Sequence, residues 1–230
     1  ETNNGTAWLA ASRPPTNSSA AGVIRIRNGH TVTVASAVTV DQVLVESGGQ
    51  LTVNNTTLTL SNGTGTDLDV AGTVVVTGSS GAISNTSGAT IAFQSGATYQ
   101  HALSAGTIPI ATWNTNSTCW VTGSTSALPG GLGQLFGHFT WNCASQSANL
   151  SLEASIAGIA GNLTVSGTGS GTLQLVNGTT ARSLNVGGDF IQTGGSFVAV
   201  GNSGAGTLNV GRNFGLSGGT FILKQSSGTA

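Results

Sequence analysis

A fourteen-residue pattern that occurs twice near the end of the chain constrains the fold more than any other feature. The segment LNVGGDFIQTGGSF begins at Leu184 and returns as LNVGRNFGLSGGTF at Leu208, an offset of 24. The Gly-Gly pair that begins at Gly194 and the pair that begins at Gly218 keep the same offset. A fixed period of this length is typical of repeat proteins, in which each repeat packs only on its neighbours.

Shorter echoes of the pattern occur in the first half of the chain. GHTVTV at Gly29, GGQLTV at Gly48, AGTVVV at Ala71 and SGATIAF at Ser87 each place a glycine-containing turn before an alternating apolar run. Such runs are typical of β-strands. Strands this short suit either a sandwich or barrel with hairpins or a solenoid of stacked coils. The self-similar period favours the solenoid, so we predict an all-β, right-handed parallel β-solenoid.

The composition agrees with a solenoid and excludes several classes of partner. The 36 glycines suit corners that need positive φ values, and Thr, Ser and Asn can stack into polar ladders. Only 6% of residues are charged and the net charge is −1, which argues against nucleic acid and anionic membranes as partners. No apolar run approaches the roughly 18 residues of a membrane span, so we expect no membrane insertion.

We expect one continuous solenoid with a cap at its beginning and an interruption in its middle. Trp8 and the pair Pro14-Pro15 suit a non-sheet entry. The final residues, FILKQSSGTA, carry no cap signal, so we expect the chain to be a trimmed fragment that continues into further protein. The predicted divisions are an entry segment (1–21), N-terminal coils (22–111), a central segment that carries tryptophan, cysteine and a glycine-rich loop (112–145), and C-terminal coils with a period of about 24 (146–230).

The two cysteines lie in the central segment. The offset between Cys119 and Cys143 equals the offset of the repeat. Residues one coil apart lie about a strand spacing from each other, which is within the reach of a disulfide. The sequence therefore predicts a disulfide between two coils and an oxidising compartment, with two buried free thiols as the alternative. Two cysteines and His138 do not complete a structural zinc site.

Three of the four tryptophans also lie in the central segment: Trp113, Trp120 and Trp141. Large aromatic side chains commonly fill the core where regular coils are interrupted. The alternative is a platform on which the rings of surface glycans stack. The sequence leaves both possibilities open.

Catalytic and cofactor-binding patterns are lacking in the sequence, so we expect neither an enzyme nor a cofactor. Glycoside hydrolysis needs two placed carboxylates, and Asp67 and Asp69 are the only close acidic pair. Positions i and i+2 share a face of a strand, so this pair could hold a calcium ion, although a solvated edge is the commoner interpretation. The three histidines are isolated, and GLGQLFG lacks the context of a nucleotide-binding loop.

Threonine-rich strands raise one further alternative, a flat array that orders water as ice-binding solenoids do. Such an array needs Thr-x-Thr on successive coils. Thr31 and Thr33, Thr57 and Thr59, and Thr73 are irregularly spaced in the sequence, which disfavours it.

Four stretches of the sequence together resemble a known group of proteins. VIRIRNGHTVTVASAVTVDQVLVESGGQLTV at Val23 looks like the opening of β-solenoid regions in large secreted surface proteins of Bacteroidota. TWNTNSTCWVTG, GLGQLFGHFTWNC and then LNVGGDFIQTGGSF look like a recurring segment of the same proteins, so that the resemblance covers most of residues 20–225. It implies export by the type IX route and an extracellular or cell-surface location. It carries over no catalytic residue.

The sequence thus predicts an extracellular structural protein, a segment of a stalk, fibre or adhesin. We expect it to associate with itself through open β-edges or with neighbouring domains of the same chain. A glycan-binding module that uses the central tryptophans is the alternative, and a polysaccharide-cleaving β-helix enzyme ranks third.

Overall fold

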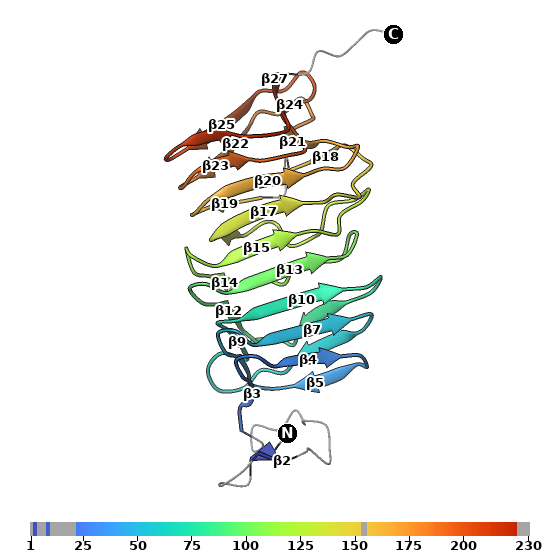
Figure 1. Cartoon of the computed structure of the whole chain (residues 1–230), viewed down its shortest axis with the longest axis vertical. Coiled ribbons are helices and arrows are strands. Elements are labelled where there is room, and N and C mark those ends of the chain that lie inside the picture. The colour runs from blue at the N-terminus through green and yellow to red at the C-terminus, as the bar shows by residue number, and fades with distance from the viewer. Residues whose placement is uncertain (1, 4–7, 10–21, 153–155, 225–230) are drawn as a thin grey trace.

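The protein is a rod of stacked β-coils that lie one above another along its long axis (Figure 1). The computed structural model describes residues 2–3, 8–9, 22–152 and 156–224. Within these residues every regular element is a strand, and about eight turns of parallel β-solenoid result. The same residues contain no helix long and apolar enough to cross a membrane. The predicted β-solenoid is therefore confirmed.

One nine-stranded parallel sheet runs the whole length of the rod, and about eight turns of the chain connect its nine successive strands. Its strands alternate inward apolar and outward polar residues, as in Leu51 and Thr52, because successive side chains of a strand point to opposite faces. In chain order they are β4 (Thr31–Val34), β7 (Gln50–Asn54), β10 (Thr73–Thr77), β13 (Thr98–Ala102), β15 (Thr118–Val121), β17 (His138–Asn142), β20 (Leu163–Gly167), β23 (Phe190–Gln192) and β26 (Phe214–Leu216).

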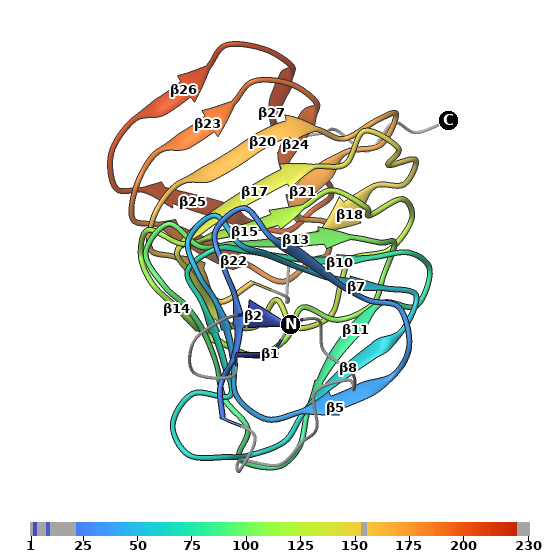
Figure 2. The same ribbon diagram turned by 60° about the horizontal axis from the view of Figure 1, so that its bottom comes forward.

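The other walls of the rod differ between its two halves (Figure 2). The N-terminal coils use a five-stranded sheet, β3 (Ile24–Ile26), β6 (Val43–Val45), β9 (Leu68–Val70), β12 (Ile91–Phe93) and β14 (Thr112–Trp113), and a three-stranded sheet, β5 (Val38–Val40), β8 (Thr57–Leu60) and β11 (Ala82–Asn85). The C-terminal coils use two four-stranded sheets, β16 (Leu135–Phe136), β19 (Gly158–Ile159), β22 (Arg182–Val186) and β25 (Gly206–Val210), and β18 (Leu150–Ser151), β21 (Leu173–Val176), β24 (Ser196–Val200) and β27 (Thr220–Lys224).

The coils differ in length, so the period seen near the end of the chain is not constant. Thr31 pairs with Gln50 in one of the shortest coils, whereas Leu163 pairs with Phe190 in a clearly longer one. The strands stay in register, and the corners absorb the difference in length. An offset measured at one end of the chain therefore does not transfer to another coil.

Corner glycines let polar side chains of one coil rest on the backbone of the next. Gly78 has a φ of +85°, and a Cβ atom built on it would lie 2.3 Å from Oδ1 of Asn55. That same Oδ1 accepts a hydrogen bond from the backbone N–H of Ser79 at 2.6 Å. A side chain at position 78 would clash with the asparagine, so glycine is needed there both for its backbone angle and for space.

The core is one continuous column of inward side chains. Two inward positions of the nine-stranded sheet stack from coil to coil, and the first of them carries Tyr99, Cys119, Phe139, Leu163 and Phe190 in register. All five are buried. Since each such side chain packs on the coil above and below, every inner coil depends on both neighbours.

The predicted central segment, 112–145, is part of the solenoid and does not interrupt it. Strands β15 and β17 belong to the nine-stranded sheet, and β16 lies inside the stretch predicted as a glycine-rich loop, 129–137. The irregular stretches are 103–111 and 122–134, where two coils lack a third strand. Of the predicted entry segment, 1–21, the structure describes only the backbone of β1 (Thr2–Asn3) and β2 (Trp8–Leu9), so the cap prediction lies outside the described residues.

Candidate functional site

The predicted disulfide between Cys119 and Cys143 was wrong. Thr118 pairs with His138 in this part of the sheet, so the neighbour of Cys119 on the next coil is Phe139. Cys143 lies four residues beyond that neighbour, directly after β17 ends at Asn142. Both cysteines are free and buried. The alternative prediction, two buried thiols in the core, matches the structure.

The two thiols are held in their neutral form by their surroundings. Burial raises the pKa of the Cys119 thiol well above its ordinary value. Burial also raises the pKa of Cys143 to about 11, and its Sγ donates to the carbonyl oxygen of Val121 at 3.5 Å. Since the thiolate is the reactive form, neither cysteine is suited to nucleophilic or redox chemistry.

Two of the three candidate tryptophans pack into the core. Trp141 is fully buried, and its Nε1 donates to Oε1 of Gln146 at 2.8 Å. Trp113 is half-buried, but its ring stacks on Phe93 at a centroid distance of 4.3 Å, and its Nε1 donates to Oε1 of Gln134 at 2.7 Å. Trp141 is enclosed, and Trp113 has one face covered by Phe93 and an edge contact with Phe136, so the structure assigns both to packing.

Trp120 lies on the outer face of the nine-stranded sheet. It is half-buried between Gln100 and Thr140, its partners on the coils below and above. Its Nε1 is covered by protein and has no hydrogen-bond partner. Next to it, Nε2 of Gln100 donates to the hydroxyl of Thr122 at 3.2 Å. The structure therefore brings together one indole, one amide and hydroxyl groups on the outer sheet face, and of the three tryptophans considered as an alternative ligand platform only Trp120 lies there.

The threonine columns on this face are interrupted. Thr31 and Thr33 begin two outward columns, but Gln50 follows the first and Trp120 lies in the second. Thr57 belongs to a different sheet. A flat hydroxyl plane of the kind that orders water therefore does not extend along the rod.

Asp67 and Asp69 do not share a ligand site. The Asp67 carboxylate is buried and accepts the backbone N–H groups of Gly63 and Thr90, both at 2.7 Å. Asp69 lies on the outer face of its strand, where Oδ1 accepts from Nε2 of Gln94 at 2.6 Å. Among the described residues, no group of three or more His, Cys, Asp or Glu side chains is placed to hold a metal. The two carboxylates act as separate hydrogen-bond acceptors.

The histidines have three different environments. His101 is buried, with Nδ1 3.2 Å from the hydroxyl of Tyr99 and Nε2 2.6 Å from the carbonyl oxygen of Ala105. Burial lowers its pKa, and the bond to Ala105 opposes that change in part. Nδ1 of His138 accepts the backbone N–H of Asn162 at 2.9 Å. His30 is exposed. These contacts are structural. The contact of His138 with Asn162 depends on the coil offset, so sequence reasoning could not find it, whereas the contacts of His101 lie within its own coil.

Both ends of the described rod expose side chains of the core type. In the last coil, Phe214 is 48% exposed and Leu216 is 53% exposed. In the first coil, the inward Val32 is 44% exposed. The strands of these coils also have one edge without a partner strand, and unpaired edges are templates for further pairing. Apolar side chains are also exposed elsewhere in the described residues, Ile110 and Leu135 among them, but at the ends such side chains coincide with unpaired strand edges.

Comparison of the chain with protein-family models, with curated proteins and with solved structures gave no match. A function must therefore be inferred from the surfaces themselves.

Proposed function

We propose that the protein is an extracellular structural element, a segment of a stalk, fibre or adhesin that extends by end-to-end stacking of its coils. The observation that carries this proposal is the exposure of core side chains and unpaired strand edges at both ends of the rod. A chain in which only 6% of the residues are charged also resists nonspecific ionic contacts. The proposed role is mechanical and does not include catalysis; release of reducing sugar from a polysaccharide by the purified protein would contradict it.

The inner coils support a role in which stiffness matters. Parallel hydrogen bonding continues through nine strands of one sheet. Side chains add to it: Oδ1 of Asn162 accepts the N–H of Asp189 at 2.9 Å, and Oδ1 of Asp189 accepts the N–H of Asn213 at 2.8 Å. A ladder of this kind ties each coil to the next, so that bending the rod breaks several bonds at once.

The two ends have complementary residue sizes. Stacking the last coil of one copy on the first coil of another continues the nine-stranded sheet with β26 beside β4. It places Phe214 over Val32 and Leu216 over Val34, larger side chains over smaller ones. The two stacked coils would differ in length by a few residues, as neighbouring coils within the rod also do. Burial of these side chains favours the contact at roughly 25 cal/mol per Å².

The cellular location is proposed from the four stretches of sequence that resemble secreted surface proteins of Bacteroidota. On that basis the protein is exported by the type IX route and remains at the cell surface or outside the cell. Protease treatment of intact cells would test this proposal, since a surface protein is digested and an internal one is protected.

Sedimentation velocity across a concentration series tests the stacking. The Phe214→Asp substitution adds a charge at the open end and should keep the protein as single rods, whereas the wild type forms longer species as concentration rises. Ser87→Asp is the matched control, because Ser87 is exposed on a side turn away from both ends, and it should associate as the wild type does. Association that is the same in all three proteins would overturn the proposal.

A second candidate function is favoured by one observation, the half-buried Trp120 on an open sheet face beside Gln100 and Thr140. An indole flanked by an amide and hydroxyl groups suits the apolar face of a sugar ring. A glycan array with the wild type and Trp120→Ala tests it. Glycan binding that survives the substitution would remove this platform as the site.

A further inference from the structure

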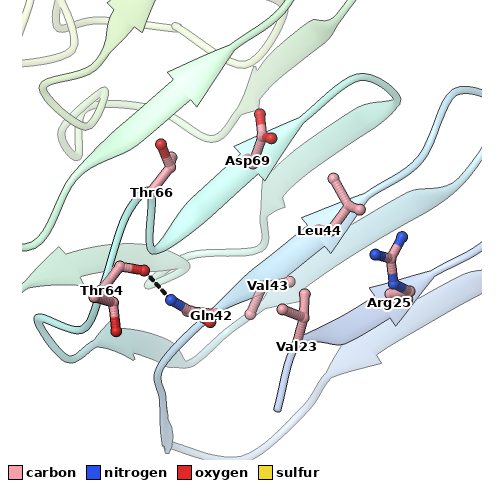
Figure 3. A pocket seen from close by; sticks show the side chains of 8 residues that line it. All are labelled: Val23, Arg25, Gln42, Val43, Leu44, Thr64, Thr66 and Asp69. Carbon is pink, nitrogen blue, oxygen red and sulfur yellow. Dashed lines mark hydrogen bonds between the residues drawn. The ribbon is translucent and has the colours of Figure 1, made fainter. Parts of the chain in front are cut away.

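A groove lies on the outer face of the five-stranded sheet, near the start of the rod (Figure 3). Its volume is about 280 Å³, and it is open to solvent. Strands β3, β6 and β9 form its floor, and the corner segment 61–67 forms one wall. Neither the end-to-end stacking nor the Trp120 face uses this surface.

The wall exists because one corner is longer than the corner below it. Only Asp41 and Gln42 join β5 to β6, whereas the whole segment 61–67 joins β8 to β9. The longer corner is held in place: the backbone N–H of Gly63 donates to the buried Asp67 carboxylate at 2.7 Å, and Nε2 of Gln42 donates to the carbonyl oxygen of Thr64. The wall is therefore ordered without any ligand.

The floor carries a donor, an apolar surface and an acceptor in register. Arg25 pairs with Leu44, and Leu44 pairs with Asp69, so the three lie in one outward column. With strands about 4.8 Å apart, the guanidinium and the carboxylate lie on either side of the leucine. Nη1 of Arg25 forms an ion pair with Oε1 of Glu46 at 3.3 Å. Oδ1 of Asp69 accepts a hydrogen bond from Nε2 of Gln94.

The polar groups of the groove are suited to a ligand that both donates and accepts hydrogen bonds. Arg25 is a donor and Asp69 is an acceptor, whereas the Thr66 hydroxyl can be either. A polyanion would meet the carboxylates of Asp69 and Glu46, and a polycation would meet Arg25. A neutral sugar presents hydroxyl groups in both roles and an apolar ring face for Leu44.

We propose that this groove binds one or two units of a neutral polysaccharide. Because the groove is open, it can take units from within a chain and not only its end. The lining contains no aromatic side chain, so the stacking energy that aromatic rings supply is missing and the affinity falls in the millimolar range, about −4 kcal/mol. Several copies in a stacked fibre would repeat the site and raise the avidity.

Saturation-transfer NMR with hexasaccharides of glucose and xylose as neutral probes, and an oligogalacturonate as the charged probe, tests the proposal. We expect saturation transfer to at least one neutral probe and a weaker signal for the charged probe. Asp69→Ala and Arg25→Ala should each reduce the affinity about tenfold, whereas Thr207→Ala, a change at an exposed residue of β25 outside both candidate sites, should leave it unchanged. Thermal unfolding of each variant shows that a lost signal is not a lost fold, and Asp69→Asn serves as a milder second variant.

Three results would overturn the proposal: no transfer to any neutral probe, binding that is unchanged in both groove variants, or binding that Trp120→Ala abolishes. These outcomes are separate from the stacking function. The Phe214→Asp variant should bind the probe as the wild type does, so failure of the groove and failure of end-to-end association give different results.

Discussion

The last two coils of the rod have nearly the same sequence and very different surroundings. Strands β22–β24 and β25–β27 pair residue by residue, with Phe190 beside Phe214 and Phe197 beside Phe221. Phe190 is fully buried, whereas Phe214 is 48% exposed. The pattern that fills the core in one coil is left at the surface in the next.

The difference shows that burial in this fold is supplied by the neighbouring coil and not by the coil itself. A coil covered on both sides has a core partner on each of them: Phe190 pairs with Leu163 of the preceding coil and stacks on Phe214 of the next, with ring centroids 4.8 Å apart. The end coil has a partner on one side only. Like the first coil, it is therefore less well packed than the inner coils and gains from a further coil.

We expect the largest effect on stability when a core phenylalanine is removed from an inner coil instead of the end coil. Phe190→Ala should lower the free energy of unfolding by about 3–5 kcal/mol, because it opens a cavity in a close-packed core. Phe214→Ala, measured at a concentration where the protein is monomeric, should cost about 1 kcal/mol or less. Chemical denaturation of both variants checks this, and equal losses would contradict the distinction between inner and end coils.

The polar ladder should show the same contrast at a smaller scale. Asn162→Ala leaves the N–H of Asp189 without its acceptor and should cost about 1–2 kcal/mol. Asn213→Ala, at the open end of the same ladder, should have an effect close to zero. Denaturation midpoints of the two variants measure the difference, and an end-coil loss as large as the inner one would show that the ladder does not follow the coil order.

The acid sensitivity of His101 tests how dry the inner column is. Burial lowers the pKa of His101 below 6.5, so the unfolded chain binds a proton first as the pH falls. Stability should be constant above about pH 6.5, decline below it and level off once the folded protein is also protonated. Unfolding curves from pH 7.5 to 4.5 measure this decline, with His101→Gln as the variant in which it should be shallower. If the free energy of unfolding depended on pH in the same way in the wild type and the variant, the idea that His101 is shielded from water would be contradicted.

We expect the smallest effect from thiol reagents, because both native cysteines are protected in the folded protein. Cys119 and Cys143 are buried, and burial raises the pKa of Cys143 to about 11, so a thiol reagent should label neither until the protein unfolds. Leu216→Cys puts a thiol at the exposed end and should be labelled rapidly in the folded rod. Mass spectrometry after short exposures separates the three sites, and fast labelling of Cys119 would indicate that inner coils open readily.

The sequence sufficed for the fold but not for most of the candidate sites. Glycine turns followed by alternating strands predicted stacked coils, since each apolar side of a coil needs a neighbour. The disulfide prediction failed because it carried the offset between Leu184 and Leu208 to a shorter coil, in which Thr118 already pairs with His138. Corner lengths set these offsets, and nothing in a single sequence fixes how many residues a corner holds.

Local alternation would have placed the tryptophans better than the count of aromatic residues did. In TCWV, Cys119 and Val121 are apolar and inward, which turns Trp120 outward; in HFTWN, Phe139 turns Trp141 inward. The groove was missed for a different reason. Its wall is the long corner 61–67, which lies beside strands of earlier coils. Its floor contains both Arg25 and Asp69, and their proximity can be recognised only when the strand register is known.

Negative-stain electron microscopy of the purified protein across a concentration series tests the central proposal most directly. End-to-end stacking predicts filaments with the constant width of one solenoid, which lengthen as concentration rises and are absent in Phe214→Asp. Discrete short rods of one length at every concentration would mean that the ends do not pair, and would contradict the proposed function.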